Sequence, residues 1–358
     1  MTRGVPCLLM RGGTSKGPFF LASDLPQDVA ERDRWLLAAM GSPDARQIDG
    51  LGGADPLTSK VGILARSSDG AADLDFLFAQ VAVREARVDT TPNCGNMLAA
   101  AGPAAVEFGL LAARGDATTL RIRTINTGMI AESTFATPGG EPAYEGDARI
   151  DGVPGTASPV TLNFLDTAGS VCGSLLPTGR VVDFIDGVPV TCIDNGMPVM
   201  VVPSAAFGLT GYESRERLNA DTELKARLNA LRLAAGPLMN LGDVAGKVVP
   251  KITLVAPPVN GGTLCTRTFI PHDCHAAIGV LGAVTVATAA VLEGSVAHAV
   301  AQLPPGDDKL ISVEHPSGEF SVALSLARGA AGGQPEVRRA ALLRTARLLM
   351  RGEVPPRR

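Results

Sequence analysis

Residues 90–111, "TTPNCGNMLAAAGPAAVEFGLL", decide the fold. The run after Asn96 consists mostly of small apolar residues, which predicts a helix that is buried on all sides. Pro103 is expected to bend this helix, because a proline inside a helix removes a backbone hydrogen bond. Cys94 and Gly95 come immediately before it, so the pattern places a thiol at the start of a buried helix.

Short apolar runs on both sides of this helix are typical of strands. Before it we expect strands at Val5–Met10, Phe19–Leu21, Val61–Ala65 and Leu74–Val83, and one helix at Gln27–Met40. After it we expect strands at Leu120–Asn126, Ile130–Thr137, Ala148–Val153 and Val160–Phe164. The 41 glycines and 26 prolines agree with many short strands joined by turns.

A second half opens near Asp183 and repeats this order. It contains an expected helix at Arg215–Leu233, strands at Ile252–Ala256 and Leu264–Ile270, and then "IPHDCHAAIGVLGAVTVATAAVLEGS" at residues 270–295. Each half runs through strands, a proline, a cysteine and an apolar helix, so we infer an internal duplication with Cys94 and Cys274 at corresponding helix starts. The predicted domains are residues 1–182 and 183–358, with the last segment packing back on the first domain.

The composition excludes several classes of protein. A net charge of −4 and an aromatic content of 4% argue against nucleic acid as a partner. The longest uncharged run, Ala276–Leu292, is near the lower limit of a membrane span, and we interpret it as a buried helix rather than a membrane segment. The six cysteines show no zinc-type spacing and predict reduced thiols in a cytoplasmic protein.

Cys94 is the strongest catalytic candidate. The positive end of a helix dipole favours the thiolate, and the free N–H groups of Gly95 and Asn96 would form a carboxylate site, with Asn93 beside them. The alternative is a cysteine that serves as a small buried hydrophobe. Four other cysteines in apolar runs fit that alternative: Cys7, Cys172, Cys192 and Cys265.

Lys60 is the second catalytic candidate. It ends the segment "GGADPLTSK" and leads into an apolar strand, where burial would favour the neutral amine that can act as a base. The alternative is an ordinary lysine whose ammonium reaches water.

Residues 11–17, "RGGTSKG", resemble a phosphate-binding loop only superficially, because Pro18 stands where the P-loop lysine should be. The loop still gathers cations and hydroxyl groups between glycines, which suits a carboxylate. A solvated turn between strands is the alternative. The candidate substrate-binding residues here are Arg11, Thr14, Ser15 and Lys16.

The second half offers weaker candidates. His272, Cys274 and His275 cluster near the second apolar helix, where they could act as acid–base groups, oxyanion donors, helix caps or core residues. Two histidines three residues apart lack a third ligand, so we expect no metal. Lys251 and Arg267 could clamp a carboxylate, and Met197 lies in the turn "DNGMP" at residues 194–198, whose backbone could face a ligand.

Five motifs together resemble the methylaconitate isomerase family, from residue 6 to about residue 351. They are "RGGTSKG", "GSPDARQIDGLGGADPLTSK", "TPNCGN", "DNGMPV" and "RTFIPH". The resemblance implies an α+β fold of the diaminopimelate epimerase-like type. Such a fold has two pseudo-duplicated halves, each with a curved, mainly antiparallel sheet rolled around a central helix, and the active site in the cleft between them.

The resemblance also implies an activity. The motifs "ADPLTSK" and "GSPDARQIDG" are most similar to those of the 4-oxalomesaconate tautomerases of gallate and protocatechuate breakdown. The family's lysine and cysteine correspond to Lys60 and Cys94, which implies a cofactor-independent proton shift in a small unsaturated tricarboxylate. Either of the two could be the base. Cys274 departs from the pattern of this branch, and a homodimer is a further expectation.

Other readings stay open at this point. The same fold could carry out 2-methylaconitate cis–trans isomerisation, or an epimerisation that uses Cys94 and Cys274 as two bases. A non-catalytic carboxylate-binding protein is a further alternative. A cysteine hydrolase would need a histidine such as His275 and an acid beside Cys94, and nothing in the sequence indicates an acyl substrate.

Overall fold

The computed structural model describes residues 4–68, 70–165, 167–327 and 336–355. The chain divides into two compact units: unit 1 is Met1–Leu165 with Leu343–Arg358, and unit 2 is Asp166–Leu342. The first division therefore falls after Leu165, whereas the sequence suggested residue 182. The C-terminal residues from Leu343 belong to unit 1.

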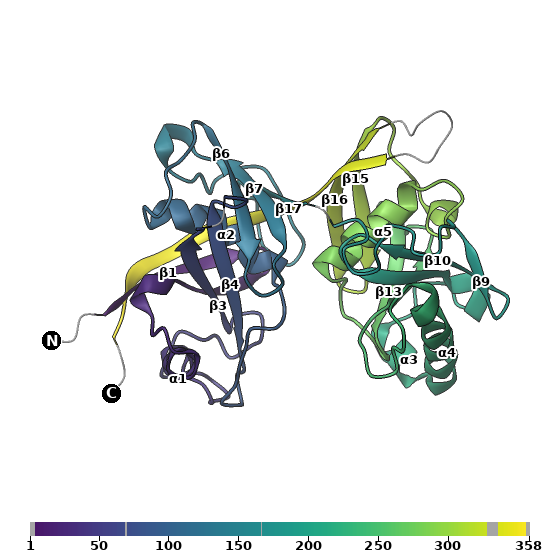
Figure 1. Cartoon of the computed structure of the whole chain (residues 1–358), viewed down its shortest axis with the longest axis horizontal. Helices are drawn as coiled ribbons and strands as arrows, with labels where there is room; N and C mark the ends of the chain where they lie inside the picture. The colour runs from purple at the N-terminus through teal and green to yellow at the C-terminus, as the bar shows by residue number, and fades with distance from the viewer. Residues whose placement is uncertain (1–3, 69, 166, 328–335, 356–358) are drawn as a thin grey trace. The chain divides into compact units, whose positions relative to one another are not determined.

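Unit 1 is built mostly from strands (Figure 1). They are β1 (Val5–Gly12), β2 (Ser15–Leu21), β3 (Lys60–Arg66), β4 (Leu74–Val81), β5 (Val88–Asp89), β6 (Ala117–Thr124), β7 (Ile130–Ala136) and β8 (Pro159–Phe164). The long last strand β17 (Glu336–Val354) pairs with β1 and β8. Apart from the parallel pairs β2–β3 and β4–β6, the neighbouring strands whose register is known run antiparallel.

The strands of unit 1 surround helix α2 (Gly95–Glu107). Pairing passes from β1 through β2, β3, β4, β6, β7 and β8 to β17, and β17 returns to β1, which closes a barrel. Helix α2 contacts β1, β2, β3, β4, β7 and β8, and its residues from Met97 to Ala105 are buried. The buried helix expected after Asn96 is therefore confirmed, and its small side chains let strands approach on every side.

The outer face of this barrel is covered in part by helix α1 (Val29–Met40). Asp28 caps its N-terminus by accepting from the backbone N–H of Glu31, and Gly41 ends it in the left-handed conformation. The side chains beneath α1 come from alternate positions of the strands, Cys7, Phe20, Val61 and Ile63 among them. Phe20 and Trp35 meet edge to face with ring centroids 5.1 Å apart.

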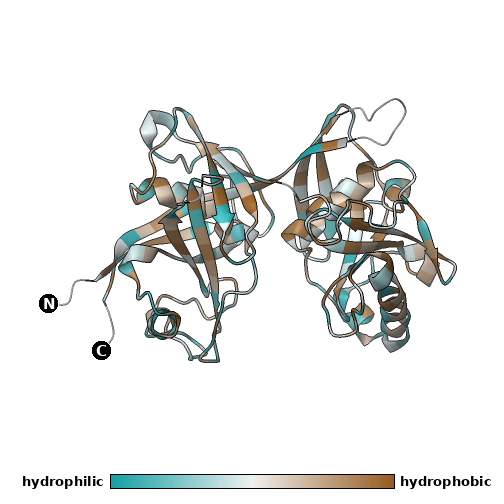
Figure 2. Ribbon diagram, in the orientation of Figure 1, coloured by the Kyte–Doolittle hydropathy of each residue, from teal (hydrophilic) through white to brown (hydrophobic). Residues whose placement is uncertain are grey.

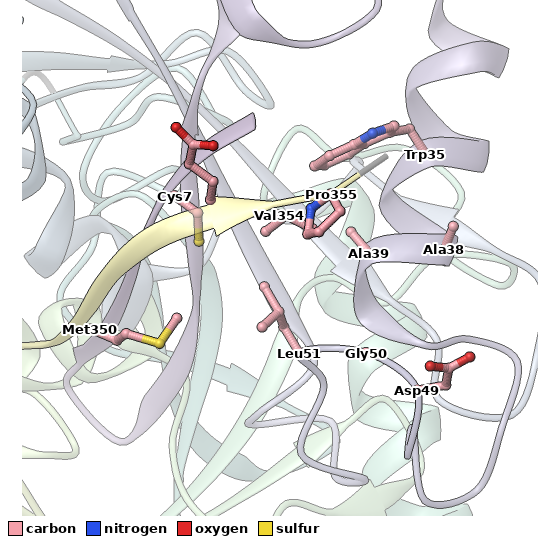
Figure 3. A pocket seen from close by; sticks show the side chains of 11 residues that line it. Cys7, Trp35, Ala38, Ala39, Asp49, Gly50, Leu51, Met350, Val354 and Pro355 are labelled. Carbon is pink, nitrogen blue, oxygen red and sulfur yellow. The ribbon is translucent and has the colours of Figure 1, made fainter. Parts of the chain in front are cut away.

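A pocket of about 330 Å³ opens beside α1, between that helix and the pair β1–β17 (Figure 3). Its walls are mostly apolar, with Trp35 and Leu51 on one side and Cys7 and Met350 on the other. Neither Lys60 nor Cys94 lines it. The pocket therefore belongs to the outer face of the barrel and not to the surroundings of α2.

Unit 2 has its own strands and helices (Figure 1). The strands are β9 (Asp183–Ile185), β10 (Val188–Asp194), β11 (Pro198–Pro203), β12 (Lys251–Ala256), β13 (Leu264–Ile270), β14 (Asp273–Cys274), β15 (Asp308–His315) and β16 (Gly318–Ala327). The helices are α3 (Arg215–Ala220), α4 (Thr222–Leu238) and α5 (Val280–Val291). Helix α5 contacts β10, β11, β15 and β16, and the face of α4 that carries Leu224, Leu228 and Leu231 joins a separate hydrophobic core.

The two units repeat one order of strand pairing. In unit 1, β2 and β3 are parallel, β3 and β4 antiparallel, β4 and β6 parallel, and α2 lies between β5 and β6 in the chain. In unit 2, β11 and β12 are parallel, β12 and β13 antiparallel, β13 and β15 parallel, and α5 lies between β14 and β15. Figure 2 shows hydrophobic residues along the strands of each unit.

Several sequence expectations require correction. Residues Ala148–Val153 form no strand; Ala148 makes only an isolated bridge with Ala157. The helix expected at Arg215–Leu233 is two helices, because Asp221 leaves the helical conformation to cap α4 by accepting from the backbone N–H of Leu224. None of the described helices is long and apolar enough to span a bilayer.

Candidate active site

Lys60 and Cys94 meet in unit 1. The side-chain nitrogen Nζ of Lys60 lies 3.4 Å from Sγ of Cys94, within hydrogen-bond range for sulfur. Lys60 is the first residue of β3, and Cys94 is the residue that precedes the first turn of α2. The two catalytic candidates of the sequence analysis are therefore in direct contact.

The Lys60 side chain is buried, with 9% of its surface exposed. Its Nζ lies 5.4 Å from the centre of the Phe78 ring, on the neighbouring strand β4. An aromatic face attracts a cation weakly and leaves the nitrogen without a fixed hydrogen-bond partner on that side. Among the described residues no carboxylate forms an ion pair with Lys60. Cys94 Sγ is thus the hydrogen-bond partner that the described residues offer to this nitrogen.

Cys94 is half-buried and occupies the N-cap position of α2 with extended backbone angles, φ −131° and ψ 99°. Its side chain does not cap the helix. The first backbone N–H groups of an α-helix have no partner within the helix, so those at the start of α2 are available to an anion. Thiol, amine and anion-binding backbone therefore converge at one helix end.

The hairpin between β1 and β2 packs on the first turn of α2. Its turn consists of Gly13 and Thr14, and the Thr14 hydroxyl accepts a hydrogen bond from the Asn96 amide at 2.9 Å. A Cβ on Gly12 would lie 2.2 Å from the Asn96 carbonyl oxygen, and one on Gly13 would lie 2.1 Å from Asn96 Oδ1. Only glycine allows this approach, which explains the paired glycines of the first motif.

Gly17 is a further glycine with a steric role at the site. A Cβ there would lie 1.8 Å from the backbone oxygen of Lys60. The neighbouring Ser15 is 1% exposed, and its hydroxyl has no hydrogen-bond partner among the described residues. A buried hydroxyl without a partner is costly, so Ser15 is a candidate contact for a bound carboxylate.

Some of the predicted substrate-binding residues of the β1–β2 hairpin do not face α2. Successive side chains of a strand point to opposite faces, and Gly12 and Gly17 face α2 because a Cβ on either would meet it. Arg11 and Lys16, which pair with each other across the two strands, consequently face the outside of the barrel. Arg11 Nη1 donates to the carbonyls of Gly13 and Thr345 and to the Thr345 hydroxyl.

Asn93 precedes Cys94 and is half-buried. Its amide nitrogen donates to the Thr127 hydroxyl at 2.5 Å, while its Oδ1 is buried and has no partner among the described residues. The side chain is therefore held by the loop that follows β6, one residue from the thiol.

Sequence reasoning missed Gln47, which organises the loop that leads to Lys60. Gln47 is 1% exposed and has a positive φ of 45°. Its Nε2 donates to the hydroxyls of Ser42 and Ser59, at 2.9 and 2.7 Å, and its Oε1 accepts from the Ala54 backbone. Ser59 in turn donates to the Val81 carbonyl. A glutamine among polar loop residues gave no local signal of this role.

In unit 2, Lys251 starts β12, and burial lowers the pKa of its ammonium. Its Nζ lies 3.4 Å from the point where a Cβ on Gly279 would be, and Gly279 caps the N-terminus of α5. Among the described residues no carboxylate pairs with it. Arg267 is buried and donates to the Glu213 and Thr266 carbonyls and to Cys265 Sγ, so Nε and Nη1 are engaged within unit 2.

Cys274 does not lie at a helix start, which corrects the expectation from sequence. It belongs to β14, whereas α5 begins at Val280. Burial raises the pKa of the Cys274 thiol to about 11, and its sulfur lies 3.7 Å from the carbonyl oxygen of His275. Cys7, Cys172, Cys192 and Cys265 are buried, as expected.

The remaining candidates of unit 2 are less suggestive. His272 and His275 are both exposed, and His275 Nδ1 is bonded to the backbone of Ala277. Met197 lies in the turn between β10 and β11, and its carbonyl accepts from the Thr285 hydroxyl of α5. Among the described residues, no group of three His, Cys, Asp or Glu side chains is arranged to hold a metal ion.

Comparison with known proteins shows the family of the chain. The family model described as "PrpF protein" matches residues 2–356. The chain is 58% identical to the (4E)-oxalomesaconate Delta-isomerase of a Novosphingobium species over 349 residues, 98% of this chain and 96% of that one. It is 57% identical to the 4-oxalomesaconate tautomerase of Pseudomonas putida over 350 residues, 98% of this chain and 95% of that one.

Solved structures give the same result. The crystal structure of methylitaconate-delta-isomerase superposes with a TM-score of 0.87 at 34% identity, covering 99% of this chain and 95% of that one. A hydroxyproline epimerase from Agrobacterium vitis shares the fold, with a TM-score of 0.52 at 16% identity over 99% and 94% of the two chains. The fold and these relatives define a sheet-rich isomerase. The chain belongs to the PrpF family.

Proposed function

We propose that the protein is a cofactor-independent isomerase of 4-oxalomesaconate that shifts a proton and a double bond in this unsaturated tricarboxylate. One observation carries the proposal: Lys60 Nζ and Cys94 Sγ are 3.4 Å apart at the uncapped start of a buried helix. The names of the relatives that are 57% and 58% identical support the choice of substrate.

The first chemical step assigns the base. Lys60, as the neutral amine, takes a proton from the substrate carbon that is conjugated with a carbonyl, so a C–H bond breaks and an N–H bond forms. The electron pair passes through the conjugated system to the carbonyl oxygen and gives a dienolate. Backbone N–H groups at the start of α2 stabilise this negative charge, because they are preorganised and need no rearrangement.

The second step assigns the acid. Cys94 gives its thiol proton to another carbon of the dienolate, so an S–H bond breaks, a C–H bond forms, the carbonyl returns and the double bond has moved. The ammonium of Lys60 then passes a proton to the Cys94 thiolate along the 3.4 Å contact. The pair returns to its starting state without a cofactor, which is the chemical advantage of placing the two groups in contact.

Ser15 is the proposed contact for a substrate carboxylate. Ser15 faces α2, and its buried hydroxyl has no partner among the described residues. It pairs in the hairpin with Gly12, whose backbone lies against Asn96. We assign the carboxylate to the Ser15 hydroxyl and to the first N–H groups of α2. The roles of Lys251 and Arg267 as further carboxylate clamps remain predictions, as does a homodimer.

The fold proposal is the diaminopimelate epimerase-like one, in which the two units are pseudo-duplicated halves. The repeated pairing order and the central position of α2 support it. The two-cysteine epimerase alternative is less well supported, because burial of the Cys274 thiol raises its pKa to about 11 and disfavours a thiolate there.

The proposal is tested by offering two acids to the purified protein. Conversion is followed by the absorbance of the conjugated chromophore, with 4-oxalomesaconate in one cuvette and 2-methylaconitate in the other. We expect rapid conversion of the first and slow or no conversion of the second. Preferential turnover of methylaconitate would assign the protein to the alternative substrate, and no turnover of either acid would favour the non-catalytic binding protein.

A further inference from the structure

A second pocket of unit 1 lies on the outer face of the barrel, apart from the lysine–cysteine pair. It has a volume of about 150 Å³ and is formed by Arg11, Thr345 and Arg347 together with residues 148, 150 and 153–157. Arg11 and Thr345 are held to each other, since Arg11 Nη1 donates to the Thr345 hydroxyl at 2.9 Å and to its carbonyl at 3.1 Å. The pocket is therefore built around a fixed guanidinium.

The described residues that line the pocket include two arginines and no carboxylate. Arg11 on β1 and Arg347 on β17 are direct cross-strand partners, and like charges in that relation destabilise a sheet. Neither guanidinium forms an ion pair with a carboxylate in the part of the chain that the structure describes. Burial and the neighbouring Arg347 both lower the pKa of Arg11, in keeping with two like charges on adjacent strands.

We propose that this pocket binds a small oxyanion, a carboxylate or a phosphate group, between Arg11 and Arg347. Guanidinium groups match the planar or tetrahedral oxygens of such ions through charge-assisted hydrogen bonds. Thr156 also lines the pocket, and its hydroxyl is a candidate further donor to such an ion. The proposal goes beyond the isomerase activity and does not depend on it.

The site is separate from the catalytic pair because of strand alternation. Gly12 and Gly17 face α2, where Lys60 and Cys94 lie. Arg11 pairs with Lys16 in the hairpin, and this pair lies between the pairs that contain Gly12 and Gly17, so Arg11 faces the opposite side of the sheet. A single molecule small enough for the pocket cannot contact both faces of the sheet. Neither Lys60 nor Cys94 lines the pocket.

The pocket is nevertheless connected to the catalytic face. Arg11 also donates to the Gly13 carbonyl at 3.0 Å, and Gly13 lies against the Asn96 side chain at the start of α2. An anion that holds Arg11 would therefore stabilise the hairpin turn that packs on the helix start. An anion bound in the pocket would therefore act as an effector of the β1–β2 hairpin.

Isothermal titration calorimetry in low-salt buffer tests the proposal. Inorganic phosphate and malonate are titrated separately into the full-length wild-type protein and into Arg347→Gln, Thr345→Val and Arg339→Gln. Arg339 is an exposed arginine of the same strand and controls for net charge. The anion that binds wild-type protein more tightly identifies the preferred oxyanion.

We expect Kd to rise by about 10-fold to 100-fold in Arg347→Gln, the loss typical of a charge-assisted hydrogen bond. Thr345→Val should weaken binding less, because it only releases Arg11 from its hydroxyl partner, and Arg339→Gln should leave Kd unchanged. The proposal is overturned if neither anion binds the wild-type protein, or if all three variants bind as the wild type does.

Discussion

The Nζ of Lys60 lies 3.4 Å from the Sγ of Cys94, although 33 residues separate them in the chain. Two features place them there: β3 begins at Lys60, and α2 begins immediately after Cys94 inside the barrel of unit 1. Burial of the lysine and the Phe78 ring beside it keep the amine away from competing carboxylates. In the proposed mechanism this contact serves as the proton relay between the base and the acid.

The two cysteines near the apolar helices should respond differently to substitution. Cys94→Ala removes the proposed acid, and we expect kcat to fall by about 100-fold or more, as for loss of a general acid. Cys274→Ser should lower kcat by less than about 3-fold at a temperature where the variant is folded, because a thiol with a raised pKa in β14 does not take part. The two kcat values are measured by steady-state kinetics. Equal losses of kcat in the two variants would favour the two-cysteine epimerase alternative.

A single methyl group at Gly17 should disrupt the site. Gly17→Ala places a Cβ 1.8 Å from the Lys60 carbonyl oxygen, so β2 or β3 must move. A shift of about 1 Å at the base can cost about 100-fold in rate. The matched control is Gly70→Ala, which adds a Cβ with no atom within 4 Å. Unchanged kcat/KM in the Gly17 variant would show that the position of Lys60 is not critical.

Gln47→Ala should lower both stability and rate. The substitution removes the donor to the Ser59 hydroxyl and the acceptor of the Ala54 N–H, which should cost about 2–3 kcal/mol in the free energy of unfolding. Because Ser59 adjoins Lys60, we also expect kcat to fall by about 10-fold at temperatures where the variant is fully folded. Urea denaturation and kinetics measure the two effects.

The exposed Gln302 provides the control for Gln47, since its side chain makes no hydrogen bond in the described structure. Gln302→Ala should change neither quantity. A Gln47 variant that loses stability but keeps the full rate would reduce this residue to a purely structural role.

Lys251 predicts a specific dependence of stability on pH. Burial lowers the pKa of its ammonium in the folded state. At a pH between the pKa of Lys251 in the folded state and its pKa in the unfolded state, the unfolded chain therefore binds more protons than the folded chain. The contribution of Lys251 to stability therefore rises as pH increases through this window and is unfavourable below it. Lys251→Met should be more stable than wild type at pH 7, and the difference should shrink as pH approaches about 10. Thermal unfolding midpoints across this range provide the test, and a difference that does not vary with pH would contradict the assignment.

The sequence predicted the elements of the fold well where the signal is local. Strands β1, β3 and β13 begin within one residue of the predicted position, because apolar residues stand at or next to the start of each. The buried helix after Cys94 followed from its composition alone. The meeting of Lys60 with Cys94 was expected from the family resemblance, and no local pattern predicts a distance between two separate segments.

Other features depend on register and long-range contacts, which one sequence does not reveal. Arg11 and Lys16 lie on the outer face because the hairpin turn holds only Gly13 and Thr14, and one more residue would reverse the faces. The role of Gln47 depends on hydroxyl partners that lie 5 and 12 residues away. Cys274 was placed at a helix start because the short strand β14 and the turn before α5 carry no apolar pattern.

Proton NMR in D₂O measures the central claim most directly. 4-Oxalomesaconate is incubated with wild-type protein, with Lys60→Met and with Lys247→Met. The Lys60→Met substitution keeps the length of the side chain but removes the amine. Lys247→Met serves as a control at an exposed lysine. We predict that the double bond moves and deuterium enters the product with the wild type and the Lys247 variant, whereas Lys60→Met leaves the acid unchanged. Conversion by Lys60→Met at the wild-type rate would contradict the assignment of Lys60 as the base.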